Sequence, residues 1–213
     1  MLGCTFFFKK EEGLINLFKR TQPFDIFDIK KLGMRVKHMN IVDFGMGITN
    51  LTRGLMKRAR DTLSAINSLK IAVNYFENAL SSNTNSKITL RKCALTYLHL
   101  SQEYKFLSKK KIDNDFELSQ KKICIDRASS YFLKSISIDD KDSESLFEYA
   151  NFCDKTGDKE KAEEFYKKAL LINDNYFQCR KCYGDLLNEL NRPDEAEQQY
   201  LLARKTSNLF EQK

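Results

Sequence analysis

Small and aromatic residues recur with a period of 34 between Ser143 and Arg204. The matched pairs are Tyr149 and Tyr183, Ala150 and Gly184, Gly157 and Asn191, Ala162 and Ala196, Tyr166 and Tyr200, and Ala169 and Ala203. Small residues at two fixed points let two helix axes approach closely, and an aromatic residue one turn later fills the gap to the neighbouring pair. The pattern therefore predicts helical hairpins that stack on one another.

This stretch resembles the tetratricopeptide repeat family. The residues that fall at the family's usual offsets are Leu146, Tyr149, Ala150, Cys153, Gly157, Ala162, Tyr166 and Ala169. The resemblance implies an all-α fold, a right-handed superhelical array of antiparallel helix pairs (an α-solenoid), that binds protein partners. It does not name the partner.

Residues 53–86 form a weaker copy of the same unit. Ala72, Phe76 and Ala79 match the second helix, expected near Leu69–Ser81. The first helix is expected near Arg53–Ala65, with Arg60 at the small-residue position, and Asn67 falls where Gly157 and Asn191 fall. Ser82–Ser86 is a polar turn cluster that ends the unit.

Residues 87–142 form a copy with a long insertion. Ala94 and Ala128 are 34 residues apart, whereas Ala150 and Ala162 are 12 apart, an excess of 22. Eleven residues on each helix add about three turns per side and keep both helices in phase, which predicts one elongated hairpin with its tip at Lys111–Asp115. The alternative is a disordered loop of about 20 residues, which is uncommon in compact domains. The lysines at 109–111 are interpreted as favourable for the dipole at a helix end rather than as a binding site.

The predicted organisation is a basic, Phe-rich segment over residues 1–52, a repeat domain over 53–206 and a tail over 207–213. The repeat units are 53–86, 87–142, 143–176 and 177–206. The N-terminal phenylalanines are expected to fold back on the repeats or to dock on a partner. The tail is too short for a full capping helix, so Leu201 and Leu202 are expected to stay partly exposed, to contact another copy or to lie under residues outside this sequence. Contact with another copy would be self-association through the C-terminal helix.

Composition fits a soluble helical protein. The chain is 42% hydrophobic and 31% charged, has two prolines, and has no apolar run long enough to cross a bilayer. Six cysteines without a secretory signal indicate free thiols in a reducing compartment, with Cys93 and Cys153 as core residues. A cytoplasmic location is predicted, with the nucleus as an alternative.

The positive charge is concentrated at the N-terminus. Residues 1–60 hold 12 Lys and Arg against 5 Asp and Glu, while residues 61–213 hold 24 of each. A basic segment can bind nucleic acid, an anionic surface or an acidic protein. Nucleic-acid or anionic-surface binding through this segment is therefore the alternative function.

Catalysis is not predicted. His38 and His99 lie far apart in the sequence, and no Gly-rich phosphate loop is present. Cys179 and Cys182 form a CxxC pair, but zinc needs four ligands and the sequence offers no second pair nearby. We predict neither a cofactor nor a metal site.

The candidate binding site follows from the resemblance, because in tetratricopeptide arrays one stripe of each first helix lines a concave groove. The stripe here contains Arg91, Leu95, Leu98, Phe147, Asn151, Lys181, Asp185 and Asn188. Apolar residues on an expected solvent face, Leu95, Leu98 and Phe147, indicate a site for a partner helix or extended peptide, unless the N-terminal phenylalanines cover them. Glu148 would repel a carboxylate, which disfavours a clamp for chaperone C-termini.

Overall fold

The computed structural model describes residues 39–58, 60–110 and 114–211, and this part of the chain is all-α. It contains α3 (Met39–Lys57), α4 (Thr62–Ser82), α5 (Lys87–Ser108), α6 (Asp115–Ile138), α7 (Ser143–Thr156), α8 (Lys159–Ile172), α9 (Phe177–Glu189) and α10 (Pro193–Glu211). The chain divides into two compact units, Met1–Cys124 (unit 1) and Ile125–Lys213 (unit 2). The all-α prediction is confirmed.

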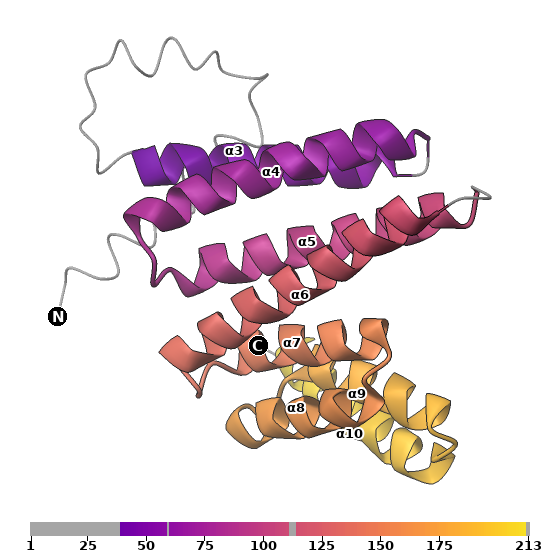
Figure 1. Ribbon diagram of the computed structural model, residues 1–213. Helices are drawn as coiled ribbons and strands as arrows, with labels where there is room; N and C mark the ends of the chain where they lie inside the picture. Colours follow the sequence, from indigo (N-terminus) through magenta and orange to yellow (C-terminus); the bar gives the residue numbers. More distant parts are fainter. Residues whose placement is uncertain (1–38, 59, 111–113, 212–213) are drawn as a thin grey trace, which may run out of the picture. The chain divides into compact units, whose positions relative to one another are not determined.

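In unit 1, α3 and α4 run side by side as an antiparallel hairpin (Figure 1). Their axes approach closely because glycines occupy the contact. A Cβ on Gly47 would lie 2.6 Å from Cε1 of Phe76, and one on Gly54 would lie 2.8 Å from Cγ of Leu69. Asp61 begins α4, since its side chain accepts a hydrogen bond from the Ser64 N–H at 3.1 Å.

The first helix of the 53–86 unit, predicted near Arg53–Ala65, was placed wrongly. No helix spans 53–65, since the chain turns between α3 and α4, and Asn67 lies within α4 rather than at a turn. The boundary predicted at residue 52 falls inside α3. The physical reason is a longer hairpin: Gly47 and Phe76, which touch, are 29 positions apart, whereas Gly184 and Tyr200 make the same contact 16 positions apart.

The elongated hairpin is confirmed as two long helices rather than a loop. Helices α5 and α6 have 22 and 24 residues, compared with 14 in each of α7 and α8. Helix α5 ends at Ser108 and α6 begins at Asp115, which brackets the predicted tip. Ser86 caps the start of α5, where its Oγ accepts a hydrogen bond from the Thr89 N–H at 3.4 Å. The division between the two units falls within α6.

Unit 2 contains α7 to α10, with tight turns inside each pair. Gly157 ends α7 in the left-handed region at φ 100°, where its N–H donates to the Cys153 carbonyl at 3.0 Å. Asn191, 34 residues later, is also left-handed at φ 59°, as Asn tolerates. Asp158 caps α8, and Pro193 is the first residue of α10, where its missing N–H has no helical partner to lose.

The repeated small and aromatic residues form part of the core of unit 2. Ala150, Ala162, Tyr166, Ala169 and Ala196 have no exposed surface. Gly184 lets the Tyr200 ring approach α9 closely, because a Cβ there would lie 2.6 Å from the ring. The burial of these residues agrees with the contacts inferred from the 34-residue period.

Within the described residues, no helix is long and apolar enough to cross a membrane. Residues 1–38 lie outside them, and so does the predicted docking of the phenylalanines before residue 39. Phe44, on α3, does pack against Phe76 of α4, at a ring-centroid distance of 5.7 Å.

Candidate protein-binding surface

A row of polar residues lies along α7 and α9 in unit 2. We call Asn151 on α7 with Lys181, Asp185 and Asn188 on α9 the polar row. The three α9 residues are exposed and Asn151 is half-buried. Lys181, Asp185 and Asn188 share one face of α9, because steps of three and four residues return to the same side of a helix.

Tyrosines from α8 and α10 hold this row in place. The Tyr166 hydroxyl donates to Oδ1 of Asn151 at 2.7 Å, and the Tyr200 hydroxyl donates to Oδ1 of Asp185 at 2.8 Å. Asn188 donates from Nδ2 to the Tyr200 oxygen at 3.0 Å. Tyr200 also packs beside Gly184 of α9, so this packing residue orients a polar group at the surface as well.

Hydrogen bonds and ion pairs connect α7 and α9 near this row. Burial first, and then the negative charge of Asp154, raise the pKa of the Tyr166 phenol, so it stays protonated and donates. At one end, Lys159 donates to Asp154 of α7 at 2.5 Å and to Glu189 of α9. Although burial opposes it, these two hydrogen bonds raise the pKa of Lys159. The row is therefore part of a fixed surface across α7 and α9.

Phe147 does not lie open on this surface, which corrects the sequence prediction. Only 6% of its surface is exposed. Its ring packs against Tyr176 at a centroid distance of 4.9 Å and against Tyr166 at 6.2 Å. Tyr176 precedes α9 and lies outside the repeated pattern, so the 34-residue period did not predict that its ring covers Phe147.

The predicted residues of unit 1 are also less open than expected. Arg91 and Leu98 are buried, with exposed fractions of 5% and 2%, and Leu95 is half-buried. The expected exposure of Leu98 is therefore wrong. Of the eight predicted residues, the four of the polar row are the ones that combine accessible polar groups on one surface.

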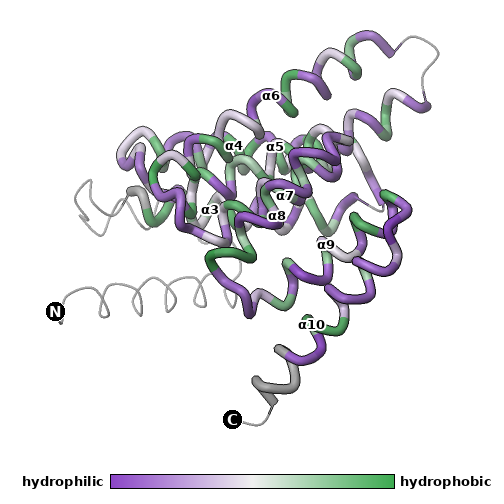
Figure 2. The backbone as a smooth tube through the Cα atoms, turned by 90° about the horizontal axis from the view of Figure 1, so that it is seen from below, coloured by the Kyte–Doolittle hydropathy of each residue, from purple (hydrophilic) through white to green (hydrophobic). Residues whose placement is uncertain are grey.

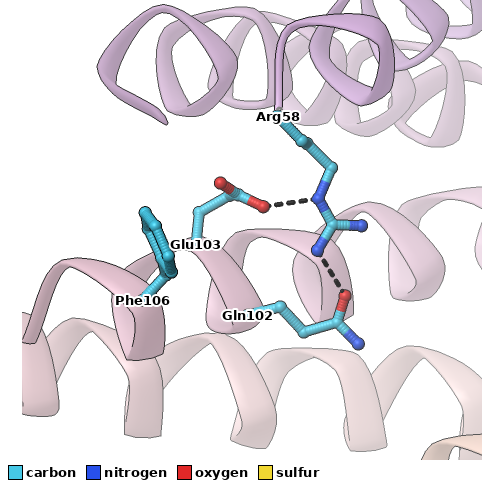
Figure 3. A pocket seen from close by; sticks show the side chains of 4 residues that line it. All are labelled: Arg58, Gln102, Glu103 and Phe106. Carbon is cyan, nitrogen blue, oxygen red and sulfur yellow. Dashed lines mark hydrogen bonds and ion pairs between the residues drawn. The ribbon is translucent and has the colours of Figure 1, made fainter. Parts of the chain in front are cut away.

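Unit 1 contains a pocket that the sequence did not indicate. It has a volume of about 390 Å³ and is lined by Arg58, Gln102, Glu103 and Phe106 (Figure 3). Arg58, on the turn after α3, donates from Nε to Glu103 at 2.5 Å and from Nη2 to Gln102 at 2.8 Å, and its Nη1 lies 3.2 Å from Nδ1 of His99. This cluster fastens the α3–α4 turn to α5. Because its guanidinium is already bonded to three side chains, Arg58 has a structural role.

The described cysteines are free thiols in the protein interior. Cys93, Cys124, Cys153 and Cys179 are buried, and Cys182 is half-buried. Burial raises the pKa of Cys179 to about 12 and also raises the pKa of Cys182, so both thiols of the CxxC pair ionise less readily than an exposed thiol. No group of three or more His, Cys, Asp or Glu side chains is placed to hold a metal ion in the described part of the chain.

Comparison with known proteins agrees with the fold of stacked helical hairpins. The family model for the tetratricopeptide repeat matches residues 131–164, which include the end of α6, all of α7 and the start of α8. No curated protein sequence matches the chain.

Solved structures match most of the chain. The structure described as "MamA MSR-1 C2" aligns over 94% of this chain and 88% of its own, with 12% identity and a TM-score of 0.54. The structure described as "MamA AMB-1 P212121" aligns over 94% of this chain and 91% of its own, with 15% identity and a TM-score of 0.53. TTC0263, a thermophilic TPR protein in Thermus thermophilus, aligns over 76% of this chain and 92% of its own, with 21% identity and a TM-score of 0.42. At these identities the likeness is one of fold. With its buried alanines and tyrosines, the chain is a tetratricopeptide-repeat-like helical repeat protein.

Proposed function

We propose that the protein is an adaptor or scaffold that binds a segment of another protein along the polar row of unit 2. The fold is one that generally serves protein–protein interaction. The observation that carries the proposal is the row itself: Lys181, Asp185 and Asn188 are exposed, while Asp185 and Asn188 are held by Tyr200. Side chains ordered before binding lose less conformational entropy when a partner arrives.

The chemistry of the row favours a polar peptide contact. Asn188 and the neighbouring exposed Gln178 can donate and accept hydrogen bonds with a peptide backbone. Lys181 and Asp185 supply charges of opposite sign on adjacent turns of α9. A segment with a complementary acid and base fits this pattern, and the buried Phe147 does not serve as an open anchor.

A peptide-display selection with the full chain tests the proposal. Peptides selected on the wild-type protein should bind the Lys181→Glu variant at least about tenfold more weakly, a loss of about 1.4 kcal/mol, because the sign of one contact charge is reversed. Lys134→Glu is the matched control, since Lys134 is an exposed lysine on α6 that does not belong to the row. Selected peptides that bind all three proteins equally would show that the row is not the site.

Binding of nucleic acid through residues 1–60 stays the alternative prediction. It differs from peptide binding in salt dependence, because each neutralised phosphate adds to a linear fall of log affinity with log salt. RNA binding that collapses between about 50 and 200 mM salt and is unchanged in Lys181→Glu would favour the alternative.

A further inference from the structure

The tips of two hairpins lie together at one end of unit 1. The contacts of Arg58 with Gln102 and Glu103 bring the α3–α4 turn against the last two turns of α5. We call the described residues of 53–63 and 105–122 the tip surface. It combines exposed apolar side chains with many cations.

Several apolar side chains of the tip surface are exposed to solvent. Met56 is 76% exposed, Leu63 64% and Phe116 65%, and Phe106 and Leu118 are also exposed. In Figure 2 the outer part of α6 alternates hydrophobic and hydrophilic positions. Exposed apolar side chains gathered at one end of a molecule indicate a docking surface.

The cations of the same surface greatly outnumber the acids. These stretches contain nine described Lys and Arg residues and three acids, and the cations are Arg53, Lys57, Arg58, Arg60, Lys105, Lys109, Lys110, Lys121 and Lys122. Arg58 is neutralised by Glu103, which is 4% exposed. Arg53, Arg60, Lys105, Lys109, Lys110 and Lys122 are exposed to solvent.

We propose that the tip surface docks the protein on an anionic lipid membrane. Lysines near such a surface each contribute about 1 kcal/mol of attraction, and apolar side chains on the same tips can enter the interface between headgroups and acyl chains. The end of α3, the start of α4 and the outer ends of α5 and α6 carry these residues, which suits a broad lipid surface. The aliphatic Met56, Leu63 and Leu118 favour lipid over nucleic acid, because bases are recognised by stacking on aromatic rings and by hydrogen bonds.

Vesicle flotation with the full chain tests this docking. The chain should float with phosphatidylcholine vesicles that contain about 30 mol% phosphatidylserine, but not with phosphatidylcholine alone, because the attraction depends on anionic headgroups. The Lys109→Glu/Lys110→Glu variant should bind at least about 30-fold more weakly, from the loss of two lysine contacts. Phe116→Ser should bind about tenfold more weakly, from the loss of one inserted ring.

Matched controls come from unit 2. Lys134→Glu/Lys141→Glu reverses two exposed lysines, and Leu171→Ser removes a leucine that is 86% exposed. Both controls should float like the wild type, and circular dichroism checks that every variant folds. Equal binding to the two vesicle types, or tip variants that float like the controls, would overturn the proposal. It would also be overturned if the tip variants lost binding to RNA or to an acidic peptide while the wild type ignored the vesicles.

Discussion

Single residues in this protein combine packing with surface chemistry. Tyr166 is fully buried and Tyr200 fills the space beside Gly184. Each hydroxyl donates to a polar side chain, Asn151 for Tyr166 and Asp185 for Tyr200. Glu163 joins α8 to α9 and to the turn before α10 in a similar way. Although burial opposes it, hydrogen bonds from Lys167, Arg192 and Tyr183 lower the pKa of the Glu163 carboxyl. Polar contacts at the surface thus reinforce helix pairs whose cores are held by apolar packing.

The buried thiol of Cys153 makes stability depend on pH in the alkaline range. Burial raises its pKa from 9.0 to about 11. Because the folded pKa is above the unfolded one, the stabilisation is fully present below pH 9 and is lost as pH rises towards 11. We expect the free energy of unfolding to fall about 1 kcal/mol per pH unit more steeply in the wild type than in Cys153→Ala over this interval.

Urea unfolding at a series of pH values measures this difference. Between pH 7 and 8 the two proteins should show the same slope, since the thiol is protonated in both states there. Parallel curves from pH 9 to 11 would mean that Cys153 ionises as easily in the folded protein as in the unfolded one.

The sequence predicted the residues whose neighbours lie within the repeated unit. Ala162, Tyr166 and Ala169 are fully buried, because their partners recur at the same spacing. Phe147 was predicted to be exposed, because its cover, Tyr176, comes from a turn that the period does not describe. The same limit applies to the hydrogen bond between Tyr200 and Asp185, which depends on the direction of a hydroxyl rather than on the hydrophobic pattern.

At the scale of helices, hairpin length decided which elements the sequence revealed. The fixed period located α7 to α10, and the excess of 22 residues indicated the long α5–α6 pair. The fixed period missed α3, because Gly47 and Phe76 are further apart in this longer hairpin. The period therefore placed Arg60 where a small residue was expected. The glycines at 47 and 54, seven residues apart on one helix face, were the available signal.

The Arg58 cluster should control the stability of the outer part of α5. Residues Ser101, Glu103, Tyr104 and Ser108 are buried there, so this part of the long hairpin is packed. Arg58→Ala leaves the buried Glu103 carboxylate without its ion pair, which should cost about 1–3 kcal/mol, since Arg58 itself is partly exposed. Hydrogen exchange should therefore become faster at residues 102–106.

Arg60→Ala is the control for this measurement, because Arg60 is exposed on the same turn. It should leave exchange in α5 at the wild-type rate. If Arg58→Ala and Arg60→Ala give the same exchange pattern, the turn is not fastened to α5 by Arg58.

At the scale of the whole molecule, the two proposed surfaces belong to different compact units. The tip surface lies in unit 1 and the polar row in unit 2, and they share no residue. If both proposals hold, the protein links a partner segment to a membrane. Binding at the two surfaces should then be independent, because mutations with no shared contacts usually act additively.

A three-component flotation experiment tests this independence. A fluorescent peptide selected on the wild-type chain should float with phosphatidylserine-containing vesicles only when the protein is present. Lys181→Glu should release the peptide while the protein still floats, because the reversed charge lies on α9 of unit 2. Lys109→Glu/Lys110→Glu should leave protein and peptide together at the bottom of the gradient, with peptide affinity in solution unchanged to within about twofold. A peptide that displaces the protein from vesicles would instead show that the two sites compete, and the linking role would be wrong even if each surface binds its own ligand.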